Sequence, residues 1–201
     1  MAEVKVLVVG RHQVADDKLI IGATVTLIKT DKNIIVDPGY LPDQEEVLLE
    51  LAKNNLKPAD IDIVCLTHLH LDHTSNVALF NKARIYCKLK ADYPGQYHVP
   101  TERYLKRVDI KDGLKLAKDV EFLLTPGHTE DHISLLVTTA QGKIIIAGDA
   151  IATASLADLD KKPLLFNDLK AYELSRQKIL KLADFIIPGH GCMFKVPLAG
   201  R

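Results

Sequence analysis

Short apolar runs and one helical repeat alternate along the first third of the chain. Residues 4–9, 24–30 and 34–36 are rich in β-branched side chains, which is typical of strands. Over residues 43–54 the apolar positions recur at helical spacing, with acidic residues in the first turn and a lysine in the last. Another apolar run, residues 61–66, leads straight into a polar segment. The order is therefore strand, hairpin, helix and strand.

The last third of the chain repeats this order. Residues 133–138 and 144–146 predict a second hairpin, residues 169–182 a helix, and residues 185–187 a short buried strand. The repeat is too long for a solenoid and indicates an internally duplicated domain. We therefore expect two sheets packed face to face with helices outside, and the polar stretch 10–18 as a loop or a surface hairpin.

Potential metal-binding side chains gather where the predicted strands end. Directly after residues 61–66, four of them fall within six positions: His68, His70, Asp72 and His73. A flat strand would point them to opposite faces, whereas a loop that turns into a helix lets all four converge. Neutral imidazole and carboxylate groups suit Zn²⁺ and related divalent metals.

Three later segments each place one further candidate ligand beside glycine, which lets the backbone come close to a neighbour. They are His128 in Pro-Gly-His-Thr, Asp149 in Gly-Asp-Ala and His190 in Pro-Gly-His-Gly. Each segment alone is a weak signal, because histidine and aspartate are common in turns. Together with the His-rich segment they favour one polynuclear metal site, built from loops at one edge of the two sheets.

Composition narrows the class of protein. The 201 residues suit a single domain, and 26 basic residues balance 26 acidic ones, so no overall field draws the chain to nucleic acid or to an anionic membrane. No apolar run approaches the ~18 residues of a membrane span, and the N-terminus lacks the pattern of a signal peptide. Three widely spaced cysteines disfavour a disulfide framework. We therefore expect a cytoplasmic protein.

The ordered set His-x-His-x-Asp-His, Pro-Gly-His-Thr, Gly-Asp-Ala and Pro-Gly-His-Gly resembles the metallo-β-lactamase superfamily, from about residue 4 to residue 196. Residues 67–80 and 175–196 are similar to the small metallo-β-lactamase-domain-containing protein 1 type. The resemblance implies an α/β fold, an αββα four-layer sandwich of two mixed β-sheets flanked by helices, which occupies the single domain 1–201.

The resemblance also implies roles for eight residues, and the position of a ninth, His132, four residues after His128, leaves two roles open. A first metal is held by His68, His70 and His128, and a second metal by Asp72, His73 and His190. Asp149 bridges the two metals, and Asp72 and Asp149 orient the nucleophile as the catalytic carboxylates. Behind them, Asp37 steadies the His-rich loop. His132 hydrogen-bonds a ligand or the substrate, or is a structural histidine at the start of a strand.

The implied activity is a metal-dependent hydrolase that uses hydroxide bound by two divalent ions, with Zn²⁺ favoured and Fe or Mn as alternatives. Acyl-homoserine lactonases share the ligand set, but they carry a tyrosine where this chain has Ala152. Residues 10–18, 92–104 and 152–168 are the expected walls of a small pocket. We therefore expect a small ester, thioester or lactone as substrate.

Two alternative activities stay open at this stage. One is a metal-dependent endoribonuclease or phosphodiesterase, and the other is a mononuclear iron enzyme of the persulfide dioxygenase kind. A small-molecule substrate is favoured over nucleic acid, no membrane partner is expected, and a homodimer is left open. The sequence assigns no role to His12, His98 or Cys192.

Overall fold

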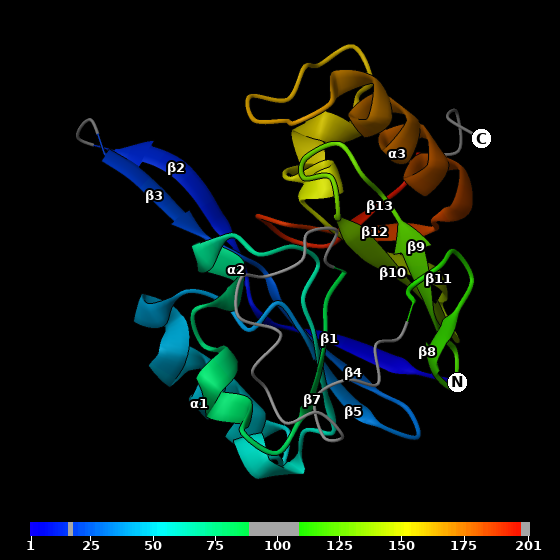
Figure 1. The fold of residues 1–201 in the computed structure, drawn as a ribbon. Helices are drawn as coiled ribbons and strands as arrows, with labels where there is room; N and C mark the ends of the chain where they lie inside the picture. The colour runs from blue at the N-terminus through cyan, green and yellow to red at the C-terminus, as the bar shows by residue number, and fades with distance from the viewer. Residues whose placement is uncertain (16–17, 89–108, 198–201) are drawn as a thin grey trace, which may run out of the picture.

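The computed structural model describes residues 1–15, 18–88 and 109–197, and its two β-sheets stack face to face with helices on their outer sides (Figure 1). The first sheet has the order β1-β4-β5-β6-β7, with β1 (Glu3–Val8), β4 (Val25–Lys29), β5 (Asn33–Val36), β6 (Ile63–Cys65) and β7 (Arg84–Tyr86). The second has the order β13-β12-β11-β10-β9-β8, with β8 (Lys115–Ala117), β9 (Val120–Leu124), β10 (Ile133–Thr139), β11 (Gly142–Gly148), β12 (Phe185–Pro188) and β13 (Phe194–Lys195). The expected αββα sandwich is confirmed.

Three α-helices and several 3₁₀ turns complete the described part. The α-helices are α1 (Gln44–Lys53), α2 (Leu71–Thr74) and α3 (Leu169–Leu182). The 3₁₀ turns are η1 (Leu41–Asp43), η2 (Pro58–Asp60), η3 (Val77–Phe80), η5 (Asp149–Ile151) and η6 (Ala154–Ala157). None of the described helices is long and apolar enough to cross a membrane.

The two sheets share one local topology, as the repeated pattern predicts. In the first, β4 and β5 form an antiparallel hairpin, and β6 returns parallel to β5 after α1. In the second, β10 and β11 form the hairpin, and β12 returns parallel to β11 after α3. Parallel neighbours end at the same edge of a sheet, so the loops that follow β5 and β6, and those that follow β11 and β12, lie together.

The apolar core has three parts, which explains why the central strands are apolar throughout and do not alternate with polar residues. Ile34 and Val36 of β5 point between the sheets, while Ile35 points to the outer side, towards α1. Strand β11 repeats this pattern, with Ile144 and Ile146 facing the other sheet. Burial on both faces makes these strands the rigid base on which the loops are mounted.

The stretch that the sequence left as a loop or a hairpin is a hairpin. Strands β2 (Arg11–Ala15) and β3 (Lys18–Gly22) pair only with each other, and they project away from the two sheets (Figure 1). An ion pair between Arg11 and the buried carboxylate of Asp43 ties the hairpin's base to η1. Because a lone two-stranded hairpin is marginally stable in water, this ion pair helps to define the direction in which the hairpin projects.

A chain of buried hydrogen bonds crosses the second sheet. His132 Nδ1 lies 2.9 Å from the Thr125 hydroxyl, which lies 2.8 Å from the Ser134 hydroxyl, and Ser134 donates to the carbonyl of Ala147 at 3.0 Å. His132 Nε2 accepts a hydrogen bond from the backbone amide of Asp149 at 3.1 Å. Burial lowers the pKa of His132 to about 3, so the ring is neutral at neutral pH.

Replacing Leu135 by alanine tests the packing between the sheets. Leu135 is fully buried there, so Leu135→Ala leaves a cavity and lowers the free energy of unfolding by about 2–5 kcal/mol. Leu49→Ala on α1, where the leucine is 55% exposed, is the matched control and changes it by less than about 0.5 kcal/mol. Urea denaturation measures both, and equal effects would contradict the packing described here.

His132 makes folding stability depend on pH. The unfolded chain protonates this histidine below its ordinary pKa of 6.5, whereas the folded chain does so only near 3, so the unfolded state binds more protons in between. As the pH is lowered from about 6 to about 4, the free energy of unfolding of the wild-type protein therefore falls. It falls by up to about 1.4 kcal/mol per pH unit more than the free energy of unfolding of His132→Gln. Urea denaturation across this range measures the difference, and parallel curves would contradict the buried neutral ring.

Candidate metal centre

The polar segments predicted from the sequence meet at one edge of the sandwich. Asp37 follows β5, His68 follows β6, Asp149 follows β11 and His190 follows β12. Each side chain thus stands at the carboxyl end of a parallel strand, where open α/β sheets commonly bind ligands. The paired strand ends of both sheets face one another here, so residues more than a hundred positions apart in the sequence become neighbours.

All seven candidate ligands come together, in two groups. In each group the potential ligand atoms lie within 4.8 Å of one another. The first group consists of His68, His70, His128 and Asp149, and the second of Asp72, His73 and His190. His70 and part of Asp72 reach solvent, while the other five side chains are buried. The arrangement is closed by protein on one side and open on the other.

Asp149 lies between the two groups. Its Oδ2 atom is 3.4 Å from His128 Nε2, and its Oδ1 atom is 3.3 Å from the Nε2 atoms of both His73 and His190. Burial opposes ionisation of Asp149, but the neighbouring imidazoles of His73 and His190 outweigh it and hold the pKa of this carboxyl well below its usual value. One carboxylate therefore presents an oxygen to each group.

Asp37 fixes the His-rich loop from behind. Its carboxylate accepts hydrogen bonds from the Thr67 amide at 2.8 Å and the Thr67 hydroxyl at 2.7 Å, and it lies 2.8 Å from His73 Nδ1. The Thr67 hydroxyl in turn lies 3.0 Å from His68 Nδ1. Both imidazoles are thereby turned so that their Nε2 atoms point into the site, which is how ligand histidines are usually oriented.

Backbone carbonyls orient two more histidines. His128 Nδ1 lies 3.2 Å from the carbonyl of Leu165, and His190 Nδ1 lies 2.9 Å from the carbonyl of Gly22. A carbonyl only accepts, so each Nδ1 carries the hydrogen and each Nε2 is directed to the centre. The loop before α3 and the end of the hairpin therefore contact the candidate ligands directly.

Several polar atoms in the centre are buried and have no hydrogen-bond partner among the described residues. They are His68 Nε2, Asp72 Oδ2, His73 Nε2 and Asp149 Oδ1. Burial and the neighbouring His73 lower the pKa of His68 well below its ordinary value, so its ring is neutral and Nε2 offers a lone pair. Isolated buried polar atoms are costly, and four that converge fit divalent metal ions as their missing partners.

The charge distribution also favours a cation here. Burial opposes protonation of His73, but the carboxylates of Asp149 and Asp37 outweigh it and raise the pKa of His73 well above its ordinary value. These carboxylates thus stabilise positive charge at the point where the ligand atoms converge. A metal ion supplies such charge and accepts the lone pairs of nitrogen and oxygen as well.

Two glycines are required by the close approach of the loops. Gly148 has φ +50°, and a Cβ there would lie 2.7 Å from the Thr67 hydroxyl. At Gly189 a Cβ would lie 1.9 Å from Asp149 Oδ1. A larger residue at position 189 would displace the carboxylate that stands between the two ligand groups, and one at position 148 would push against Thr67 and His132.

The structure places His132 behind the centre. Its ring is 1% exposed, and both nitrogens are engaged, one by the Asp149 amide and the other by Thr125. It does not line the cavity described below. Two of the interpretations that the sequence left open describe this position, because His132 is a buried histidine directly before β10 and its ring also contacts the backbone of a candidate ligand.

Helix α3 contributes residues that the sequence did not single out. The Tyr172 hydroxyl donates to the carbonyl of Asp149 at 2.9 Å, and the Ser175 hydroxyl donates to the carbonyl of Pro126 at 2.7 Å. Burial raises the pKa of Tyr172. Nothing in the helical pattern distinguishes these residues from ordinary core positions, so only the structure connects them with the centre.

A cavity of about 450 Å³ opens on the candidate ligands. Its lining residues come from the hairpin (His12 and Ile21), the centre (His128, Asp149 and His190), the segment 152–165 (Ala152, Thr153, Ser155, Leu156, Lys161, Lys162, Pro163, Leu164 and Leu165) and α3 (Tyr172). The expected walls 10–18 and 152–168 therefore each contribute to the cavity. The third expected wall, residues 92–104 with His98, lies outside the described residues.

Apolar side chains alternate with the candidate ligands in the His-rich segment. Leu69 and Leu71, which alternate with the ligands, are 39% and 73% exposed. They point outward because the ligands between them converge inward. His12 is exposed, with its ring centroid 5.8 Å from that of His190, and Cys192 is exposed as well.

Comparison with known proteins identifies the family. The family described as the metallo-beta-lactamase superfamily matches residues 21–190. Metallo-beta-lactamase domain-containing protein 1 of Xenopus laevis is 34% identical over 183 residues, which cover 89% of this chain and 74% of that protein. In the human, rat and mouse proteins of that name the match covers 59 to 63% of the protein, so this chain spans less than two thirds of their length.

Solved structures of known proteins show the same fold. A proposed metallo-β-lactamase from Thermotoga maritima superposes with a TM-score of 0.73 at 26% identity, covering 96% of this chain and 99% of that one. The dizinc quorum-quenching lactonase AidC, solved with a product, has a TM-score of 0.62 at 21% identity and covers 87% of this chain and 74% of that one. Because the family match spans most of the sequence, this chain belongs to the metallo-β-lactamase superfamily, as a metal-dependent hydrolase similar to the metallo-β-lactamase domain-containing protein 1 type.

Proposed function

We propose that this chain holds two divalent metal ions, with Zn²⁺ favoured over Fe or Mn, and hydrolyses a small ester, thioester or lactone. The observation that carries the proposal is the position of Asp149, whose two carboxylate oxygens face different ligand groups beside a cavity of about 450 Å³. The likeness to a dizinc lactonase supports it. Imidazole and carboxylate ligands in groups of three or four suit zinc in particular.

The proposed ligand assignment follows the two groups. His68, His70 and His128 hold the first ion, and Asp72, His73 and His190 hold the second. Asp149 bridges them, which is the role that a carboxylate with one oxygen on each side can perform. Asp37 and His132 act through these ligands: Asp37 orients His73, and His132 holds the amide of Asp149.

When bound, a pair of divalent ions lowers the pKa of water, polarises a carbonyl oxygen and stabilises a leaving group. The chain supplies the remaining requirements. Asp72 and Asp149 are the carboxylates at the centre, so both orient the attacking water, and Asp72, which is partly exposed, takes up its proton. Leu156, Pro163 and Leu165 line the cavity beside them and exclude bulk water from an apolar part of the substrate.

The volume of the cavity and the net charge of the chain favour a small acyl substrate over a polynucleotide. A volume of about 450 Å³ is within the range of small-molecule pockets. Proteins that bind nucleic acid usually contact several phosphates with lysine and arginine, whereas the formal net charge here is zero. The nuclease activity is therefore the second candidate. A mononuclear iron oxygenase is the third, because it would leave the Asp72, His73 and His190 group without a metal.

A cytoplasmic location is proposed from the cysteines. Cys65 is buried, Cys87 is partly buried and Cys192 is exposed, and all three are free thiols. Free thiols persist in a reducing compartment, where structural disulfides are rare.

The bridging role of Asp149 is tested by Asp149→Ala. We expect wild-type protein to hold close to two metal ions per chain by elemental analysis, and Asp149→Ala to lose at least one of them. Its kcat/KM falls by at least about 100-fold, because the carboxylate between the ligand groups is lost. Asp109→Ala, which removes an exposed carboxylate, is the control, and it keeps the metal content and the kcat/KM of the wild-type protein. Full activity of Asp149→Ala, or a loaded wild-type protein with one metal, would contradict the assignment.

The substrate class is tested with a neutral acyl ester, phenyl hexanoate. The zinc-loaded protein releases phenol, a chelator stops the reaction, and zinc restores it. Between about 50 and about 300 mM salt the rate changes by less than about twofold, because an uncharged substrate has no attraction to screen. Salt-sensitive RNA binding with strand cleavage, and no ester hydrolysis by the same sample, would replace the proposal by the nuclease. One iron per chain with consumption of O₂ would replace it by the oxygenase.

A further inference from the structure

Two lysines lie on the wall of the cavity, away from the metal-binding side chains. We propose that Lys161 and Lys162 form a distal anion-binding subsite, so that the preferred substrate is an acyl compound with an anionic group at the end of an apolar chain. This inference rests on the proposed function and adds a second group, the terminal anion, by which the protein recognises its substrate. Both lysines line the cavity, and both side chains are exposed.

The charges of these lysines are available to a ligand. Within residues 1–15, 18–88 and 109–197, no salt bridge joins either ammonium group to a carboxylate. Asp149 is the single carboxylate among the described lining residues, and it belongs to the metal centre. Asp158 and Asp160 precede the lysines in the sequence, but they do not line the cavity. An anion in the cavity therefore meets two unpaired positive charges.

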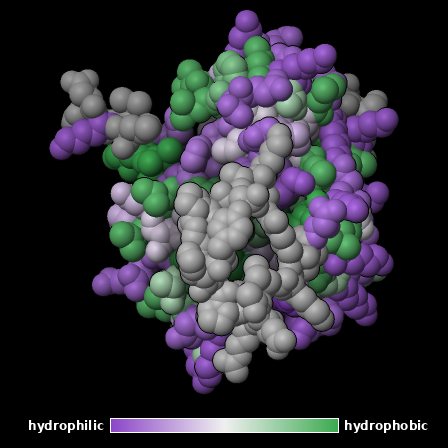
Figure 2. Space-filling model, viewed as in Figure 1, coloured by the Kyte–Doolittle hydropathy of each residue, from purple (hydrophilic) through white to green (hydrophobic). Residues whose placement is uncertain are grey.

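An apolar stretch connects the lysines with the centre. Pro163, Leu164 and Leu165 follow directly and line the same cavity, and the Leu165 carbonyl lies 3.2 Å from His128 Nδ1. Three residues span at most roughly 11 Å, a distance that a medium-length acyl chain can cover. Leu164 is 86% exposed and Leu165 is 66% exposed, and Figure 2 shows hydrophobic side chains gathered over this part of the loop before α3.

The lysine-bearing segment is held by a buried arginine of α3. Arg176 is 1% exposed, and its guanidinium donates to the carbonyls of Leu156 and Lys161, each at 2.9 Å, and to the carbonyl of Asp158. These carbonyls belong to the wall itself, so one planar donor group fixes its path. The guanidinium also lies 6.0 Å from the centroid of the Tyr172 ring. The subsite is therefore mounted on the same helix that contacts Asp149.

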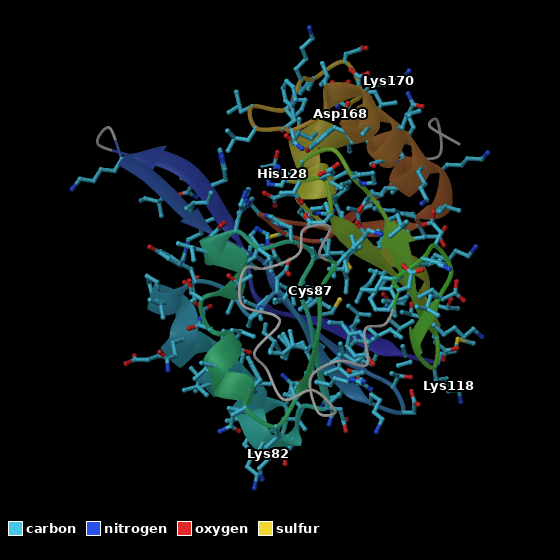
Figure 3. The ribbon with its side chains drawn as sticks, in the orientation of Figure 1. Lys82, Cys87, Lys118, His128, Asp168 and Lys170 are labelled. Atoms are coloured by element: carbon cyan, nitrogen blue, oxygen red, sulfur yellow. The ribbon has the colours of Figure 1, made fainter. Side chains whose placement is uncertain are left out.

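The test compares two double variants with equal loss of charge. Lys161→Gln/Lys162→Gln removes the proposed subsite. Lys82→Gln/Lys118→Gln removes two lysines at the opposite end of the molecule from His128 (Figure 3). Phenyl hexanoate and the monophenyl ester of adipic acid, which adds a terminal carboxylate, are the paired substrates. Calorimetric binding of hexanoate and adipate to zinc-loaded protein gives a readout that does not depend on turnover.

In wild-type protein and in the Lys82/Lys118 variant, we expect KM to be about tenfold lower for the adipate ester, and adipate to bind about tenfold more tightly than hexanoate. Lys161→Gln/Lys162→Gln loses both preferences, while its kcat for phenyl hexanoate and its metal content stay unchanged. Equal KM values and equal binding in wild-type protein would overturn the subsite while leaving the hydrolase intact. Lysine-dependent binding of adipate without hydrolysis of either ester would support the subsite and contradict the proposed function.

Discussion

The placement of one carboxylate between two sets of imidazoles is the constraint on which this structure depends. Asp149 can occupy that place because Gly189 lets the loop after β12 approach the Asp149 carboxylate more closely than any side chain would permit, and Gly148 does the same for the approach of β11 to Thr67. The resulting concentration of buried nitrogen and oxygen atoms is unfavourable by itself, since several lack hydrogen-bond partners among the described residues. Metal ions would remove that cost, so the site stabilises the fold when it is loaded.

Support for the centre comes from three directions, each of which fixes different side chains. Asp37 holds the His-rich loop through Thr67 and His73, and the start of β10 holds the Asp149 amide through His132. Helix α3 holds the Asp149 carbonyl through Tyr172. Because each support belongs to a different layer of the sandwich, the candidate ligands are oriented by the whole fold and not by their own loops alone.

Apart from three candidate ligands and Tyr172, the residues that line the cavity belong to elements outside the duplicated framework. The hairpin β2–β3 and the segment 152–165 both line it, and each also accepts a hydrogen bond from a candidate ligand through a backbone carbonyl. Substrate recognition and ligand orientation are therefore physically connected. A change in the backbone path of either wall would act on the centre as well as on the substrate, whereas a change of an exposed side chain on the wall acts on the substrate alone.

The sequence by itself determined the two hairpin–helix–strand repeats and the seven candidate ligands, because apolar periodicity and residue type are local properties of the chain that do not depend on its tertiary structure. It also located the wall at 152–168. The pairing of β2 with β3, the short strands β7, β8, β9 and β13, and the contacts of Tyr172 and Arg176 were decided only by tertiary structure. Short edge strands are defined by their partners, and a tyrosine or an arginine on a helix has no sequence signal for the distant carbonyl to which it donates.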